Sequence, residues 1–212
     1  MGRRSKRTPR CERCRMPSAH CLCSRLPRLA LTTRVVLVMH FREAEKASAT
    51  GPMALAALDN SELHLHGALA RRLDLSHLNS RDGDILVLFP GDGAVPLQEI
   101  VSRPTERPST LVVPDGNWQQ ARRMTKRLFG LQRQIRVTLP AGPPTEWGVR
   151  RETREGGLAT FEAIARALGI LESDEVQAQL ETYFRLMVRT TFALKGCPQR
   201  APMRHLAGDS EL

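Results

Sequence analysis

The stretch TLVVPDGNWQQARRM, residues 110–124, joins a short strand to a helix through a tight loop. Residues 110–113 (TLVV) are mostly β-branched or apolar and predict a buried strand, and residues 118–129 are predicted to be a helix. The loop at residues 114–118 follows the carboxyl end of the strand. Because alternating strands and helices are typical of α/β proteins, this stretch predicts an α/β fold.

Three more strands are predicted outside this stretch, at residues 34–40 (RVVLVMH), 85–89 (ILVLF) and 134–139 (QIRVTL). Their nearly continuous apolar character is typical of a parallel sheet that is buried on both faces. Helices are expected at residues 52–58, 67–72, 158–168 and 174–195. We therefore expect a mostly parallel sheet with helices on its flanks.

The two C-terminal helices carry the clearest periodicity. The helix at 158–168 (LATFEAIARAL) is expected to be amphipathic, with Thr160 as its cap and Glu162 near the positive end of its dipole. The helix at 174–195 has one apolar face, which predicts core packing. That face comprises Val176, Leu180, Phe184, Met187, Thr191 and Leu194.

Loops rich in glycine and proline follow three of the strands, at residues 88–93 (LFPGDG), 114–118 (PDGNW) and 140–160. Open α/β sheets bind ligands outside the carboxyl ends of their strands, and glycines there let backbone amides approach a ligand. Each loop alone is an ordinary turn, but three together predict a pocket. No phosphate loop and no G-x-G-x-x-G motif is present, which excludes the common nucleotide-binding sites.

Four of the five cysteines, Cys11, Cys14, Cys21 and Cys23, form the pattern C-x2-C-x6-C-x-C. Two close thiolate pairs can supply the closed tetrahedral shell of a structural zinc, whereas loose thiols, disulfides or an iron–sulfur cluster are weaker interpretations of this spacing. The flanking arginines are expected to lower the thiol pKa values. His20 is expected to lie outside the shell, and Cys197 is interpreted as an ordinary thiol.

The chain carries 32 Lys and Arg against 22 Asp and Glu, which gives a net charge of +10. Nine basic residues and one acid lie in residues 1–30, and six basic residues and no acid lie in residues 116–145. The excess indicates an anionic partner, with nucleic acid first, although a general solubilising bias is the alternative. Since apolar runs reach only six residues and no secretory pattern precedes them, we expect a cytoplasmic protein that does not span a membrane.

Several motifs together resemble the DTW-domain family, which is named for an Asp-x-Thr-Trp signature. The signature stands here as Asp115-Gly116-Asn117-Trp118, so Asn117 occupies the Thr position. The other family motifs occur in the same order along the chain: C-x-R-C and C-x-C at residues 11–14 and 21–23, a strand ending at His40 with Arg-Glu-Ala at residues 42–44, Thr-Gly-x-x-Ala-Leu at 50–55, Pro90-Gly91, an arginine-rich segment with Arg150, Arg151 and Arg154, and Thr-x-Glu-Ala at 160–163.

This resemblance implies a tRNA-uridine aminocarboxypropyltransferase related to the SPOUT methyltransferases. Such an enzyme moves the 3-amino-3-carboxypropyl group of S-adenosylmethionine to N3 of a tRNA uridine and releases methylthioadenosine. The implied fold is a SPOUT-like, mostly parallel sheet with flanking helices and a C-terminal trefoil knot. The expected organisation is a basic segment with a zinc knuckle (residues 1–30), a catalytic domain (31–198) and a tail (199–212).

The resemblance also implies roles for individual residues. Asp115 is the expected base, although either Asp115 or Asn117 can instead cap the following helix, and the two roles are compatible. Residues expected to contact S-adenosylmethionine are Pro90, Gly91, Gly116, Asn117, Trp118, Arg151, Arg154, Leu158 and Thr160. The arginines can clamp a carboxylate or tRNA phosphates, or form an exposed loop balanced by acids. Trp118 can stack on a base or belong to the core.

Two other classes of function stay open on this sequence. A methyltransferase with the same cofactor and fold would release S-adenosylhomocysteine instead of methylthioadenosine. A zinc-dependent RNA-binding module without catalysis would not bind S-adenosylmethionine at all.

Overall fold

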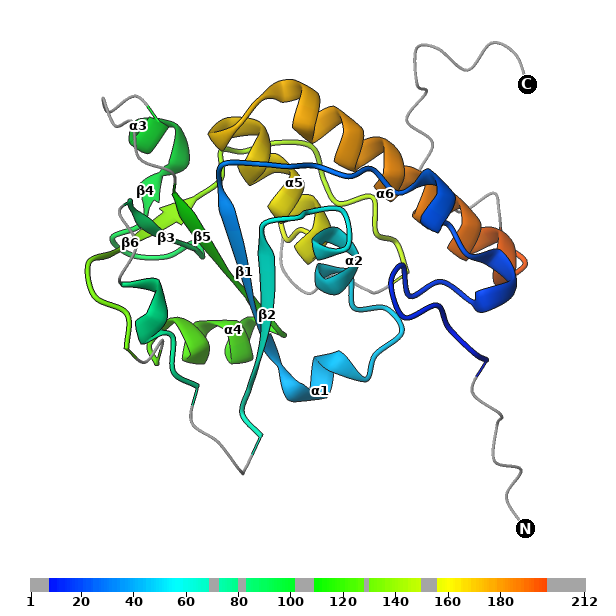
Figure 1. Ribbon diagram of the computed structural model, residues 1–212, viewed down its shortest axis with the longest axis horizontal. Coiled ribbons are helices and arrows are strands. Elements are labelled where there is room, and N and C mark those ends of the chain that lie inside the picture. Colours follow the sequence, from blue (N-terminus) through cyan, green and yellow to red (C-terminus); the bar gives the residue numbers. More distant parts are fainter. Residues whose placement is uncertain are drawn as a thin grey trace.

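Figure 1 shows the computed structural model of the chain, which describes residues 8–68, 73–79, 83–101, 109–127, 130–149 and 156–197. Within these ranges six parallel strands form one sheet, in the order β2-β1-β5-β3-β6-β4. The strands are β1 (Arg34–His40), β2 (Ser61–His66), β3 (Ile85–Leu88), β4 (Val95–Pro96), β5 (Thr110–Asp115) and β6 (Gln134–Thr138). The predicted α/β class and parallel sheet are confirmed.

Helices cover both faces of this sheet. The helices are α1 (Phe41–Ala44), α2 (Gly51–Leu55), α3 (Leu97–Val101), α4 (Trp118–Thr125), α5 (Thr160–Leu171) and α6 (Asp174–Leu194), with short 3-10 helices η1 (Ser18–His20), η2 (Cys23–Arg25) and η3 (Ser76–Leu78). In β1, Leu37 and Met39 belong to a core with α2, α5 and α6, whereas Val36 and Val38 belong to a second core with α4 and η3. Alternation along the strand therefore supplies apolar side chains to both layers.

Helix α5 is the centre of the larger layer. None of its residues is exposed, because the sheet covers one side and α6 covers another (Figure 1). The expected amphipathic helix is confirmed, because residues such as Phe161, Ile164 and Leu168 are buried whereas Ala163, Arg166 and Ile170 are only partly buried. The predicted stripe on α6 is confirmed for Leu180, Phe184 and Met187, but at the end of the helix Phe192 is buried and Leu194 is 42% exposed.

The cap predicted for α5 is also corrected. Ala159 holds the cap position, and Thr160 is the first residue of the helix. The backbone N–H of Ala159 donates to Glu162 Oε2 at 2.9 Å, so the Glu162 carboxylate stabilises this end of the helix. The hydroxyl of Thr160 is thereby available for a contact outside α5.

Strands β2 and β4 were not expected from the sequence. β2 lies at the sheet edge and alternates polar and apolar residues (SELHLH), a weaker signal than the continuous apolar runs of the central strands. The helix predicted at 67–72 does not include residues 67 and 68, and residues 69–72 lie outside the described ranges. The tail at 199–212 and residues 1–7 also lie outside them. Across the described residues, no helix has the length and apolar character needed to cross a bilayer.

Candidate functional site

The carboxyl ends of β5, β3 and β6 lie side by side, because these strands are neighbours in the sheet. The loops that follow them enclose a cavity of about 350 Å³. Its walls include Phe89 after β3, Trp118 on α4 and Leu139 after β6, and α5 closes it with Ala163 and Arg166. The three loops thus meet as predicted.

Only some of the residues expected to contact the cofactor line this cavity. Pro90, Trp118, Leu158 and Thr160 line it, whereas Gly91, Gly116 and Asn117 do not. Trp118 is half-buried and its ring lies 5.6 Å from the ring of Phe89, so it both packs and faces the cavity. The three arginines at positions 150, 151 and 154 lie outside the described residues.

Asp115 ends β5 and is 6% exposed. Its Oδ1 accepts a hydrogen bond of 2.8 Å from the hydroxyl of Thr160 on α5. Asp115 lines a smaller cavity of about 80 Å³, and this cavity shares Leu158 and Thr160 with the larger one. Thr160 therefore lies between the carboxylate and the larger cavity.

The start of α2 packs tightly against this carboxylate. A Cβ at Gly51 would lie 2.8 Å from Asp115 Oδ2 and 2.8 Å from Leu37 Cδ2, so any side chain at this position would displace one or both of them. The preceding Thr50 accepts a hydrogen bond of 3.2 Å from the N–H of Phe161 at the start of α5. The Thr-Gly and Thr-x-Glu-Ala motifs therefore meet at Asp115.

Asn117 is the cap of α4. Its Oδ1 accepts from the N–H of Gln120 at 2.9 Å, and the side chain of Gln120 accepts from the N–H of Asn117 at 2.8 Å. These reciprocal bonds form a capping box. Of the two residues that could cap this helix, Asn117 does so, and Asp115 contacts α5 instead.

Two residues of α5 hold the long loop before it. The buried carboxylate of Glu162 accepts from the hydroxyl of Thr145 and, at 2.6 Å, from the N–H of Glu146. Burial raises the pKa of Glu162, and these hydrogen bonds partly oppose the rise. Arg166 donates to the carbonyl of Pro143 at 2.8 Å and is the only charged residue lining the larger cavity within the described chain. Sequence reasoning missed Arg166, although it is the single cation in the mostly apolar α5.

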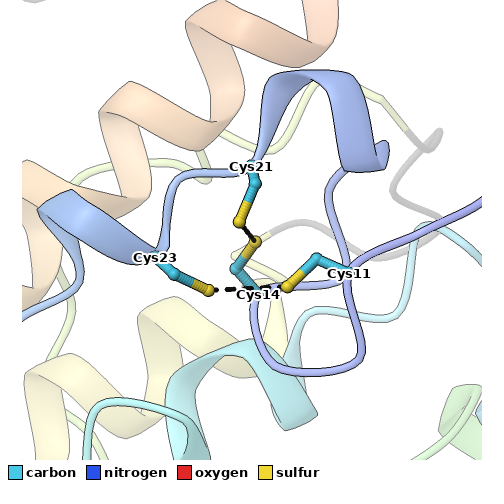
Figure 2. A group of neighbouring side chains, drawn as sticks. All are labelled: Cys11, Cys14, Cys21 and Cys23. Carbon is cyan, nitrogen blue, oxygen red and sulfur yellow. Dashed lines mark hydrogen bonds between the residues drawn. The ribbon is translucent and has the colours of Figure 1, made fainter.

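The four N-terminal cysteines converge on one point (Figure 2). Cys11 Sγ lies 3.5 Å from Cys23 Sγ, Cys14 Sγ lies 3.7 Å from Cys21 Sγ, and all four sulfur atoms lie within 4.8 Å of one another. Zinc held by thiolates at about 2.3 Å in a tetrahedron separates sulfur atoms by about 3.8 Å. The group can therefore hold a metal ion, and His20 and Cys197 are outside it, as expected.

Backbone hydrogen bonds and burial, rather than the flanking arginines, shift the pKa values of the thiols. Hydrogen bonds from the backbone of Cys14 and Arg13 lower the pKa of Cys11 to about 6, whereas burial raises the pKa of Cys14. The arginines instead anchor the segment: Arg13 donates to Ala56 O at 3.3 Å and Arg15 to Ala44 O at 2.7 Å. Figure 1 shows this segment alongside α6.

Comparison with known proteins gives a consistent family. The model of the DTW domain matches residues 8–192. A protein named tRNA-uridine aminocarboxypropyltransferase 2 from Macaca fascicularis is 30% identical over 176 residues, which cover 80% of this chain and 59% of that protein. The protein of the same name from Drosophila melanogaster is 29% identical, covering 79% of this chain and 68% of that protein.

A plant protein, tRNA-uridine aminocarboxypropyltransferase A from Arabidopsis thaliana, is 29% identical over 215 residues, which cover 84% of this chain and 79% of that protein. The chain spans about three-fifths of the length of the Macaca relative. No solved structure matches it.

Proposed function

Because the chain belongs to the DTW domain family, we propose that it transfers the 3-amino-3-carboxypropyl group of S-adenosylmethionine to N3 of a tRNA uridine, releasing methylthioadenosine. The names of the relatives support the reaction. The observation that carries the proposal at the site is the cavity at the ends of β3, β5 and β6, which adjoins the buried Asp115–Thr160 pair.

The residues around the larger cavity suit S-adenosylmethionine. Its volume of about 350 Å³ lies in the range of small-molecule sites, and Phe89 and Trp118 offer apolar ring surfaces for an adenosine. Arg166 can pair with the carboxylate of the methionyl part. When bound, S-adenosylmethionine would supply the electrophilic carbon next to its sulfonium.

In this proposal Asp115 accepts the N3 proton of the uridine. That proton is weakly acidic, and a carboxylate positioned within hydrogen-bond reach assists its removal as the new N–C bond forms. The hydroxyl of Thr160 holds one carboxylate oxygen, and Gly51 leaves space for the other. Asp115 is thereby fixed in one orientation, which favours reaction at a single carbon of the sulfonium.

The reaction products test the proposal directly. Incubated with tRNA and S-adenosylmethionine, the protein should release methylthioadenosine, and nucleoside mass spectrometry should find an aminocarboxypropyl group on uridine. S-adenosylhomocysteine together with a methylated base would make the protein a methyltransferase. A protein that binds tRNA but neither binds nor consumes S-adenosylmethionine would be a binding module.

We also infer that Cys11, Cys14, Cys21 and Cys23 hold a structural zinc ion. Four thiolates leave no open position, so the ion would stabilise the N-terminal segment and take no part in transfer. The SPOUT relationship also implies a trefoil knot, which stays a prediction. A cytoplasmic location stays a prediction as well.

Removing this metal should destabilise the chain. We expect Cys14→Ser to weaken the sulfur-to-cobalt charge-transfer absorption of the cobalt-loaded protein and to lower its melting temperature, by about 2–4 °C per kcal/mol lost. Cys197→Ser is the matched control, because Cys197 lies outside the cluster. Unchanged absorption in the Cys14 variant would refute the assignment.

A further inference from the structure

A second group of possible metal ligands lies at the opposite sheet edge from β4, where β2 meets η3. Glu62 and His64 are two positions apart on β2 and therefore project from the same face. His77 approaches them from η3, and one ligand atom of each residue lies within 4.8 Å of the others. The cysteine cluster and the cavity share none of these residues.

The distances in this group are those of ligands around one ion. Glu62 Oε1 lies 3.2 Å from His77 Nε2, and Glu62 Oε2 lies 3.5 Å from His64 Nε2. A divalent transition ion bound at about 2.0–2.2 Å by nitrogen and oxygen atoms separates its ligands by about 3.3–3.5 Å in a tetrahedron. Small side-chain rotations would be enough to admit an ion.

His64 supplies an independent observation. Its Nε2 is buried, and within the described part of the chain it makes no hydrogen bond. A buried polar nitrogen without such a bond costs free energy, and coordination of a metal ion by its lone pair would remove that cost. The imidazole of His77 lies against that of His64, with ring centroids 5.6 Å apart.

Arg34 on β1 fixes the carboxylate between the two imidazoles. Its guanidinium donates to Glu62 Oε2 at 2.7 Å, and the two side chains are 16% and 21% exposed. A carboxylate has several lone pairs, so it can accept this bond and still present Oε1 to an ion. Hydrogen bonds of this kind orient metal-binding carboxylates, although the positive charge of Arg34 lowers affinity.

From this arrangement we propose that Glu62, His64 and His77 bind a divalent transition-metal ion that prefers imidazole and carboxylate ligands, with Zn²⁺ or Co²⁺ as representatives. The ion ties η3 to the edge strand β2. The three ligands leave room for water in a tetrahedral shell. The proposal does not depend on the transfer reaction.

Cobalt titration of the full-length, reduced protein tests this site separately from the cysteines. An ion held by nitrogen and oxygen gives no sulfur-to-metal charge-transfer band. The readout is therefore the number of cobalt equivalents that bind to the protein without adding to that band. We expect one such equivalent in the wild type. We expect it to be lost in the double variant His64→Gln/His77→Gln, with the charge-transfer band unchanged.

Two further variants secure the result. Glu62→Gln keeps the shape of the side chain and its acceptor for Arg34, and should weaken this equivalent at least tenfold even if the double variant does not fold. His205→Gln removes one imidazole elsewhere in the sequence and should leave the affinity for this cobalt equivalent unchanged. If the wild type binds no equivalent free of the charge-transfer band, or if Glu62→Gln binds it as tightly as the wild type, the proposal is wrong.

Discussion

Asp115 and Thr160 are 45 positions apart in the chain, and their hydrogen bond joins the end of β5 to the start of α5. A buried carboxylate held by one hydroxyl is well placed to accept a proton, because its orientation is fixed before the substrate binds. Glycine at position 51 is part of the same arrangement, since any side chain there would displace the carboxylate.

Asp115→Asn should lower turnover by about 10²- to 10⁴-fold, because an amide cannot accept the N3 proton. The fold should survive, since the amide oxygen still accepts from Thr160. Single-turnover assays with circular dichroism as a check on folding would measure both effects.

Asp59→Asn is the matched control, because Asp59 is exposed and outside the cavity lining. Normal turnover in the Asp115 variant would rule out its role as the base.

Helix α4 shows how the departure from the family signature is accommodated. The signature has Thr where this chain has Asn117, and that position is the helix cap. Both residues cap helices well, because each presents a short side chain with an oxygen acceptor. The substitution therefore preserves the local structure of the loop that carries Asp115.

Two variants at this cap test whether Thr can replace Asn117 in its structural role. Asn117→Ala should lower the free energy of unfolding by about 1 kcal/mol, whereas Asn117→Thr should change it by only a few tenths. Urea denaturation measures the difference. If the Thr variant is as unstable as the Ala variant, Thr does not replace Asn117 as the cap of α4.

Across the whole molecule, positive charge continues from the cavity along α4. Trp118 at the start of α4 lines the cavity, and the exposed side chains of Arg122, Arg123, Lys126 and Arg127 follow it. No acid interrupts residues 116–145, so this surface is suited to contact the phosphates of a nucleic acid.

The affinity for tRNA should therefore fall steeply with salt. Replacing Arg122 and Arg123 by Gln should weaken binding and reduce the slope of log K against log salt by about 0.7–0.9 for each phosphate that the variant no longer neutralises. Filter binding across a salt series measures this. Lys195→Gln, beyond the end of α6, is a control expected to keep the wild-type slope, and an unchanged slope in the double arginine variant would place the RNA elsewhere.

Stability should also depend on pH through two histidines at the ends of β1 and β2. Burial lowers the pKa of His40 and of His66 below 6.5, with nearby positive groups adding to the effect. The unfolded chain then binds protons more tightly than the folded one, so acidification favours unfolding.

We expect the histidine contribution to make the free energy of unfolding fall as the pH drops below about 6.5 toward 5.5, above the range where ordinary carboxylates titrate. Denaturation curves at pH 7.5 and 5.5 test this. In the double variant His40→Gln/His66→Gln, the free energy of unfolding should differ less between the two pH values than in the wild type. If the difference is the same, other groups cause the pH dependence.

The sequence by itself determined the central strands, because continuous apolar runs such as VVLVM at 35–39 are stable only when buried on both faces. It also predicted the cysteine cluster, since four thiols at the spacing C-x2-C-x6-C-x-C can surround one zinc ion. The order of the family motifs likewise indicated which loops form the site.

Only the tertiary structure decided how distant residues meet. The bond between Asp115 and Thr160, the position of Arg166 in the cavity wall and the approach of His77 to Glu62 depend on strand order and helix packing. Local propensity holds no information about such contacts. The residues of each pair are far apart in the sequence, and the crossover connections of the sheet bring them together. The same reason explains β2, whose mixed pattern becomes a strand only because β1 offers it an edge to pair with.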